Sequence, residues 1–97
     1  MSHPVLWTDE AIENLENILR YISTNWTERE VNKFKARLSE QIEIISKFPN
    51  VFPASPTTPR LRKAVLTRQT IIFYEVKEQI IYITYLFDSR QDPKEVK

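Results

Sequence analysis

Apolar residues recur at helical spacing in two stretches of the first half of the chain, residues 11–22 and 31–48. In both stretches they fall every three or four positions, which places them along one face of an amphipathic helix. Thr8 precedes the first stretch as a candidate N-cap, and Thr27 begins a capping-box pattern before the second. Pro49 ends the second helix because proline cannot continue it. The pattern therefore predicts an α-hairpin, two helices joined by a short linker.

The spacing of the apolar residues changes from helical to extended in the second half of the chain. Strands are predicted at residues 61–66, 70–76 and 79–87, and a short apolar run at residues 5–7 predicts another near the start. The turn at Lys77-Glu78 contains no glycine, which argues against a primed hairpin turn there. We therefore predict an α+β domain in the order β-α-α-β-β-β, with a small antiparallel sheet packed against the α-hairpin.

The last predicted strand is apolar on both faces. Alternation along the strand separates two sets of large residues, Ile81, Ile83, Tyr85 and Phe87 on one face and Ile80, Tyr82 and Leu86 on the other. Two helices cover only one face of a sheet this small. The second face is therefore closed either by loops of the chain itself or by a partner.

The composition excludes most common types of catalytic site. The 97 residues include no glycine, no cysteine and a single histidine, His3. Glycine-dependent phosphate loops, thiol nucleophiles, thiolate metal sites and Ser-His pairs are therefore excluded, and we expect neither a metal nor a cofactor. No apolar run is long enough to cross a membrane, and the first residues lack the pattern of a signal peptide. We therefore expect a cytoplasmic protein without a membrane partner.

Positive charge is concentrated in the second half of the chain, although the net charge is only +1. Five cations stand near the ends of predicted strands, namely Arg60, Arg62, Lys63, Arg68 and Arg90. Strand ends lie close together in an antiparallel sheet, so we expect the five to converge on one surface suited to RNA, DNA or an acidic protein. One alternative is a charged edge strand that protects the sheet from aggregation. For Arg90 another alternative is an ion pair at a turn with Asp88 or Asp92.

Several short segments, taken in order along the chain, resemble the RelE/ParE superfamily of bacterial toxins. They are Trp7-Thr8-Asp9-Glu10-Ala11, Tyr21-Ile22, Asn25-Trp26-Thr27-Glu28, Phe48-Pro49, Leu61-Arg62-Lys63, Ile72-Phe73-Tyr74 and Phe87-Asp88-Ser89-Arg90-Gln91-Asp92-Pro93. The resemblance extends over nearly the whole chain and implies a single RelE/ParE-like toxin domain at residues 1–97. It also implies the toxin of a type II toxin–antitoxin pair, of the kind often described as plasmid stabilisation proteins.

The same resemblance implies a cognate antitoxin as the partner. Such antitoxins wrap the toxin surface, and the resulting complex represses its own operon, with operator DNA contacted through the antitoxin. An antitoxin segment that folds on binding would close the sheet face that carries Ile80, Tyr82 and Leu86. These three residues are therefore the expected antitoxin-binding residues.

The superfamily divides by target. RelE-like members are mRNA interferases that cleave messenger RNA on the ribosome, whereas ParE-like members poison DNA gyrase. RelE-like members carry an arginine at the start of the penultimate strand, where this chain has Thr70, and a tyrosine or histidine in the tail, where residues 91–97 have neither. The resemblance therefore favours a ParE-like DNA gyrase inhibitor, with target-binding residues Arg60, Arg62, Lys63, Arg68 and Arg90.

Two alternatives to gyrase inhibition stay open. In the first, the chain is a ribosome-dependent endoribonuclease, and the charge that develops on the scissile phosphate is stabilised by Arg62, Lys63, Arg68 and Arg90. In the second, the chain is an inactive relative that is retained as a binding module. The residues alone do not decide whether the chain is an enzyme.

Overall fold

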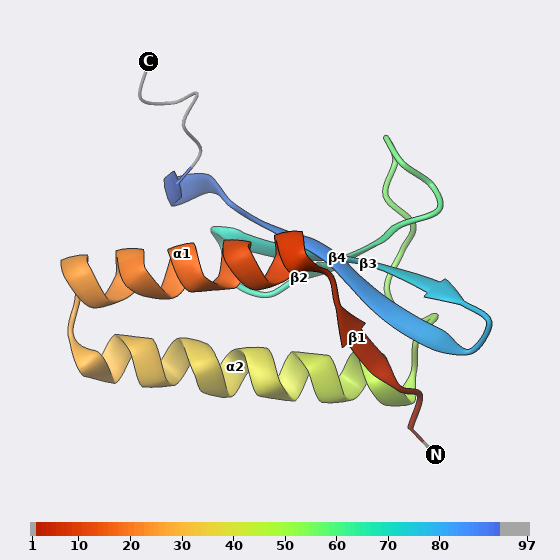
Figure 1. Cartoon of the computed structure of the whole chain (residues 1–97), viewed down its shortest axis with the longest axis horizontal. Helices are drawn as coiled ribbons and strands as arrows, with labels where there is room; N and C mark the ends of the chain where they lie inside the picture. The colour runs from red at the N-terminus through yellow and green to blue at the C-terminus, as the bar shows by residue number, and fades with distance from the viewer. Residues whose placement is uncertain (1, 92–97) are drawn as a thin grey trace.

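The structure is a computed structural model that describes residues 2–91 (Figure 1). The helices and strands follow one another in the predicted order, and they are β1 (Val5–Trp7), α1 (Asp9–Asn25), α2 (Glu28–Lys47), β2 (Arg62–Val65), β3 (Thr70–Lys77), β4 (Ile80–Asp88) and a short 3₁₀ turn η1 (Ser89–Gln91). The predicted α+β class is therefore confirmed. No helix among the described residues is long and apolar enough to cross a membrane.

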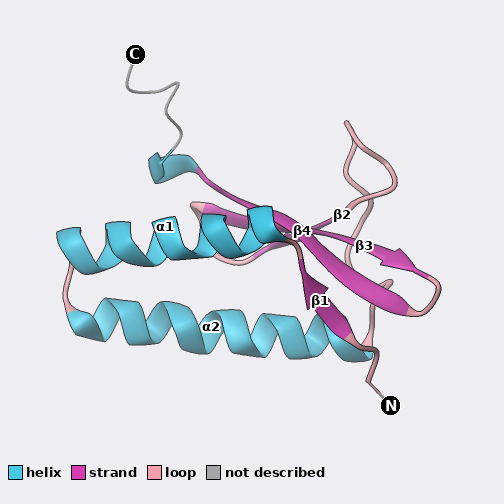
Figure 2. Cartoon of the chain, in the orientation of Figure 1, coloured by secondary structure: helices cyan, strands magenta, loops and turns pink. Residues whose placement is uncertain are grey.

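The four strands form one sheet in the order β1-β4-β3-β2. Strands β2, β3 and β4 pair antiparallel as predicted, but β1 pairs parallel with β4, so the sheet is mixed. The direction of β1 is not set by a hairpin, because α1, α2, β2 and β3 all intervene before β4. The α-hairpin packs against one side of the sheet, which leaves the other side without a helix (Figure 2).

The two helices begin in different ways. The Thr8 side chain caps α1 by accepting a hydrogen bond from the backbone N–H of Ala11 at 3.0 Å. The same hydroxyl donates to the carbonyl of Thr84 at 2.8 Å, which ties the start of α1 to β4. At the start of α2 the side chain of Thr27 makes no capping hydrogen bond, so the predicted capping box does not form. The first turn of α2 rests on backbone bonds alone, including one from Glu30 to Thr27 at 3.0 Å.

The β3–β4 hairpin turns through Glu78 and Gln79, with φ angles of 53° and 70°. Positive φ at both central residues is the requirement of a primed turn, so the prediction from the missing glycine is wrong. Neither residue is glycine, and each therefore carries a steric cost of about 1–2 kcal/mol in this conformation. The long ladder between the two strands over-determines the turn and holds both residues there.

A β-bulge interrupts β4 near its middle. Phe73 pairs with Tyr85, but the next residue, Tyr74, pairs with Ile83. Thr84 is therefore an extra residue on β4, with no partner of its own on β3. Because side chains alternate along a strand, one extra residue exchanges the faces of everything that follows it.

This exchange overturns part of the prediction for the last strand. Leu86 is only 4% exposed and belongs to the core, whereas Phe87 is 39% exposed on the opposite face. The prediction that Leu86 shares a face with Ile80 and Tyr82 is therefore wrong. Those two residues lie before the bulge and are half-buried on the face away from the helices.

The core lies between the α-hairpin and the inner face of the sheet. Its largest wholly buried side chains come mostly from the two central strands, and apolar residues of both helices pack against them. The sheet contributes Ala64, Ile72, Tyr74, Ile81, Ile83 and Leu86, the turn after β2 contributes Leu66, and the helices contribute Ala11, Ile18, Ile22, Phe34, Leu38 and Ile45. The helical spacing in the sequence therefore marks most of the buried face of each helix, although Ile12 and Phe48 of the predicted stripes are 43% and 61% exposed.

Candidate functional site

Three polar side chains meet where β3 begins and β4 ends. The hydroxyl of Thr70 donates to a carboxylate oxygen of Asp88 at 2.6 Å. The guanidinium of Arg90 binds the same carboxylate with two nitrogens, Nε at 2.9 Å and Nη2 at 2.6 Å. Thr70 is wholly buried, and the Asp88 side chain is only 2% exposed. The cluster of Thr70, Asp88 and Arg90 is therefore satisfied within the chain.

The charges in this cluster stabilise one another. Burial disfavours the carboxylate of Asp88, but hydrogen bonds from Arg90 and Thr70 outweigh burial and hold its pKa below the usual range. The hydrogen bond to Asp88 likewise raises the pKa of Arg90 against its own burial. The guanidinium also lies 5.7 Å from the centre of the Tyr21 ring, a cation–π contact that links η1 to α1. Of the two alternatives for Arg90, the ion pair with Asp88 is observed, while Asp92 lies outside the described residues.

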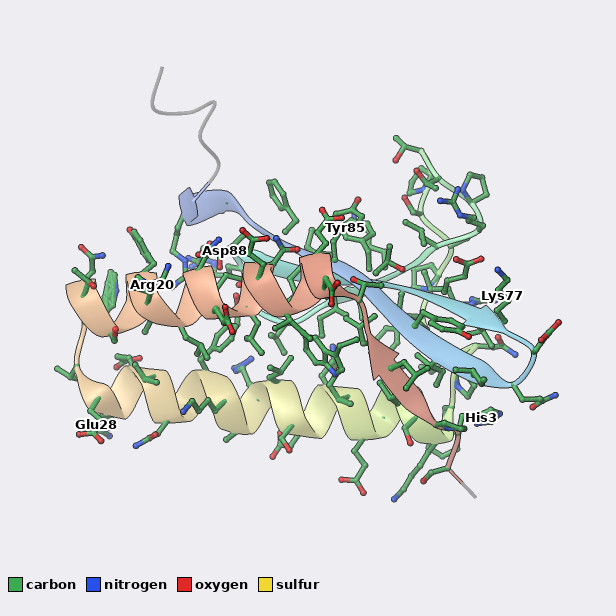
Figure 3. All side chains as sticks on the ribbon, viewed as in Figure 1. His3, Arg20, Glu28, Lys77, Tyr85 and Asp88 are labelled. Atoms are coloured by element: carbon green, nitrogen blue, oxygen red, sulfur yellow. The ribbon has the colours of Figure 1, made fainter. Side chains whose placement is uncertain are left out.

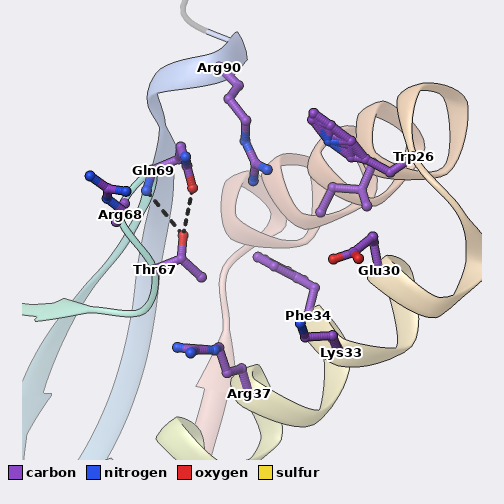
Figure 4. Close-up of a pocket in the computed structure, with 10 residues that line it drawn as sticks. Trp26, Glu30, Lys33, Phe34, Arg37, Thr67, Arg68, Gln69 and Arg90 are labelled. Atoms are coloured by element: carbon purple, nitrogen blue, oxygen red, sulfur yellow. Dashed lines mark hydrogen bonds between the residues drawn. The ribbon is translucent and has the colours of Figure 1, made fainter.

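A pocket opens beside this cluster, between the facing ends of α1 and α2 and the β2–β3 turn (Figure 4). Its volume is about 330 Å³, and its lining contains four cations and one carboxylate. The lining residues are Ile22, Trp26, Glu30, Lys33, Phe34, Arg37, Thr67, Arg68, Gln69 and Arg90. Because Asp88 neutralises Arg90 and Glu30 offsets one further cation, the pocket is positive on balance in a chain whose net charge is only +1.

Most of the cations around the pocket are available to a ligand. Among residues 2–91, no ion pair is formed by Lys33, Arg37 or Arg68. Arg37 is held in place by a hydrogen bond to the carbonyl of Leu66 at 3.3 Å. Sequence reasoning missed Lys33 and Arg37 as site residues, although their spacing of four places them on the same face of α2. The sequence does not predict that this face of α2 lies beside the β2–β3 turn.

The opposite end of the sheet holds Arg62 in a different way. Its guanidinium donates to the carbonyl of Phe52 at 2.5 Å and to that of Asn50 at 3.5 Å, which fastens the proline-rich loop to β2. The buried hydroxyl of Tyr74 donates to the carbonyl of Pro49 at 2.7 Å in the same loop. Burial raises the pKa of Tyr74, and the nearby charge of Arg62 opposes the rise. Arg62 therefore stabilises a loop.

The remaining two predicted cations lie apart from the pocket as well. Arg60 is 3.8 Å from Glu75, a pair whose arginine is 68% exposed and which is therefore weak. Lys63 lies opposite Phe73 on the outer face of the sheet. Of the five cations expected to converge, the structure brings only Arg68 and Arg90 to one pocket.

The outer face of the sheet, the face away from the helices, is rich in large apolar side chains. Phe73 and Tyr85 stack there with ring centres 4.6 Å apart and planes inclined by 18°. Tyr85 lies on the side of the sheet remote from α2 (Figure 3). The exposed members of this face include Leu6, Val65 and Phe87. The helices of the chain therefore leave the outer face of the last strand open.

The described residues offer no metal site. Residues 2–91 contain no group of three or more histidine, aspartate or glutamate side chains placed to hold an ion together. The acidic member of the cluster, Asp88, is already bound by Arg90 and Thr70. The charged groups that line the pocket are those of arginine and lysine, with the carboxylate of Glu30 beside them.

Solved structures with the same fold include components of toxin–antitoxin systems. A chain from the chromosomal ParDE TA system of P. aeruginosa superposes with a TM-score of 0.75 at 20% identity, covering 90% of this chain and 96% of that one. A chain of the toxin–antitoxin complex RelBE2 from Mycobacterium tuberculosis gives 0.63 at 13% identity, covering 91% and 99%. YafQ from E. coli gives 0.59 at 12% identity, covering 91% and 94%. At such low identity these matches show the shared fold.

The sequence itself gives the family. No curated protein sequence matches the chain significantly. Residues 5–93 match the family described as the ParE toxin of the type II toxin–antitoxin system parDE, and this match spans all strands and helices of the fold. The chain therefore belongs to the ParE toxin family, within the RelE/ParE superfamily of type II toxins.

Proposed function

We propose that this toxin arrests growth by binding DNA gyrase and that it is not a nuclease. The observation that carries the proposal is the cluster of Thr70, Asp88 and Arg90, in which the guanidinium is neutralised by a buried carboxylate. A residue that stabilises the transition state of RNA cleavage must direct its positive charge at the phosphate. Here a phosphate that approached Arg90 would also approach the negative charge of Asp88.

The position of Thr70 supports the same proposal. RelE-like nucleases carry an arginine at the start of the penultimate strand. This chain has Thr70 there, as the first residue of β3. Its side chain is wholly buried and its hydroxyl is already bonded to Asp88. Thr70 therefore neither carries a charge nor reaches a substrate.

The pocket favours a second candidate function, ribosome-dependent cleavage of mRNA. Its unpaired cations, Lys33, Arg37 and Arg68, are groups that bind RNA phosphates well. Cleavage by a 2′-hydroxyl also needs a general base and a general acid, and loss of one such group typically costs about 10²–10⁴ in rate. Among the described lining residues only Glu30 is an acid, which makes cleavage the less supported of the two functions.

One experiment decides between the two functions. The purified full-length chain is added to a DNA gyrase supercoiling assay and, separately, to translating ribosomes with a defined mRNA. We expect loss of supercoiling with DNA breaks trapped by gyrase, and intact mRNA. Topoisomerase I relaxation of the same plasmid is the control and should be unaffected. Cleavage of mRNA in translated frames with normal supercoiling would overturn the proposal. The absence of both effects would indicate a binding module.

We also propose that a cognate antitoxin covers the outer face of the sheet and carries the complex to operator DNA. The exposed apolar residues of that face support this, and the matching ParDE and RelBE2 structures are described as toxin–antitoxin systems. Ile80 and Tyr82 remain proposed antitoxin contacts. The bulge turns Leu86 inward and Phe87 outward, so we propose Phe87 as the third contact in place of Leu86. A gyrase-binding toxin and its antitoxin would meet in the cytoplasm.

Substitution on β4 tests the antitoxin surface. Tyr82→Ala should weaken antitoxin binding by about tenfold or more, since aromatic anchors dominate such interfaces. Lys35→Ala, on the exposed side of α2, is the matched control and should leave the affinity unchanged. Equal affinity of wild type and the Tyr82 variant would remove the outer face from the interface.

A further inference from the structure

We propose that the pocket between α1, α2 and the β2–β3 turn binds a nucleoside monophosphate whose base carries an exocyclic amino group. The inference goes beyond the choice between gyrase and mRNA. A direct binding measurement tests it whatever the cellular target is, so its failure and that of the gyrase proposal are separate results.

One side of the pocket is suited to a phosphate. Lys33 and Arg37 lie one turn apart on α2, and Arg68 stands across from them on the β2–β3 turn (Figure 4). Within residues 2–91 these three cations form no ion pair, so their charges are available to an anion. A phosphate dianion bound beside them accepts charge-assisted hydrogen bonds from the ammonium and guanidinium groups.

The other side of the pocket is suited to a flat ring. Trp26 follows the end of α1, lines the pocket and is 44% exposed, while the buried Phe34 and Ile22 complete an apolar wall. Nucleobases stack on exposed aromatic side chains because every base has a π-face. A ligand with a phosphate at one end and a base at the other matches this division of the pocket.

Glu30 fixes the orientation of the ligand and the type of base. It is the one carboxylate among the described lining residues, and its side chain points into the pocket on the same side as Trp26 (Figure 4). Its charge repels the phosphate, which therefore lies toward the cations Lys33, Arg37 and Arg68. A carboxylate accepts hydrogen bonds, so it matches the amino group of adenine, cytosine or guanine.

The size of the pocket limits the ligand to one nucleotide. Its volume of about 330 Å³ lies near the lower limit for small-molecule pockets. The volume therefore favours a mononucleotide over an oligonucleotide.

Calorimetric titration of the purified full-length chain tests the proposal at fixed ionic strength. The four titrants are adenosine monophosphate, inosine monophosphate, adenosine and inorganic phosphate. We expect adenosine monophosphate to bind about tenfold or more tightly than each of the others, because each of them lacks one of the matched groups. Inosine monophosphate lacks the amino group, adenosine lacks the phosphate, and inorganic phosphate lacks the base.

Two lysines on α2 provide a matched pair of variants. Lys33→Gln should weaken adenosine monophosphate binding about tenfold, since a charge-assisted hydrogen bond is lost. Lys35 is exposed on the same helix and does not line the pocket. Lys35→Gln should therefore change the affinity by less than about twofold, because it removes only a screened distant charge. Trp26→Leu should weaken the binding of adenosine monophosphate but not the binding of inorganic phosphate.

Several results would overturn the proposal. Inorganic phosphate that bound as tightly as the nucleotide would reduce the site to a general anion patch. Equal weakening by the variants at Lys33 and Lys35 would show that net charge, not the pocket, attracts the ligand. Binding of a 5′-phosphorylated oligonucleotide without binding of free adenosine monophosphate would assign the cations to a nucleic-acid track instead.

Discussion

The two ends of the small sheet use arginine in opposite ways. At the loop end, Arg62 donates hydrogen bonds to the backbone carbonyls of Asn50 and Phe52 and so holds the proline-rich loop against β2. At the turn end, Arg68 lines an open pocket and has no ion-pair partner among the described residues. Arg62 and Arg68 therefore look alike in the sequence but differ in what remains for a ligand. The backbone carbonyls within reach decide between the two roles.

Arg90 combines both roles and gives the largest expected effect on stability. Arg90→Ala leaves the carboxylate of Asp88 buried without its cation, which should destabilise the fold by about 3 kcal/mol. Urea unfolding followed by circular dichroism measures the loss. We also expect growth arrest to weaken in cells.

A double variant separates the two consequences of losing Arg90. Asp88→Asn combined with Arg90→Met removes both charges and should recover most of the stability. If the double variant folds but no longer arrests growth, Arg90 contacts the target. Full growth arrest by the double variant would confine Arg90 to a structural role.

The second expected effect is a loss of stability in acid that depends on Asp88. Its pKa is lower in the folded chain than the usual value of 3.8, so its contribution is complete above that pH and is lost as the pH falls through the folded pKa. The free energy of unfolding should therefore fall more steeply below about pH 4 in the wild type than in Asp88→Asn. Identical slopes in urea titrations at several acidic pH values would contradict this reading of the cluster.

The third effect is smaller and lies at the loop end. Arg62→Met keeps the aliphatic stem but removes the hydrogen bonds to the proline-rich loop, which should cost about 1–2 kcal/mol. Amide hydrogen exchange should accelerate in residues 49–60 more than in the helices. Unchanged protection of that loop would mean that Tyr74 and its bond to Pro49 hold it alone.

The smallest effect on stability is expected for Arg68, and it completes the comparison. Arg68→Gln should change the free energy of unfolding by no more than about 0.5 kcal/mol, because the side chain is exposed and has no ion pair among the described residues. Growth arrest should weaken nonetheless if the pocket faces the target. A stability loss as large as that of Arg62→Met would abolish the distinction between the two ends.

The sequence predicted the fold where its signal is periodic. Apolar residues at helical spacing identified both helices, and runs of β-branched and aromatic residues identified β3 and β4, because burial places those residues. The direction of β1 was not predictable from periodicity, since a three-residue strand has the same pattern in either direction. The primed turn at Glu78 and Gln79 was missed because the tertiary context overrides the local preference for glycine.

The site was predicted less completely than the fold. The charges of Arg68 and Arg90 pointed to the right end of the sheet, but the pocket also needs Lys33 and Arg37, which reach it only through the packing of α2. The buried position of Asp88 was not predictable either. It depends on the extra residue Thr84, and no composition rule marks a bulge.

That extra residue has a consequence for how the chain tolerates a single-codon deletion. Removing Thr84 would leave Ile83 inward and Tyr85 outward in regular alternation, so Phe87 would stay on the outer face and Asp88 would stay buried beside Arg90. The deletion would instead remove the Thr84 carbonyl to which Thr8 donates, so its cost would fall on the junction between α1 and β4 and not on the arginine cluster.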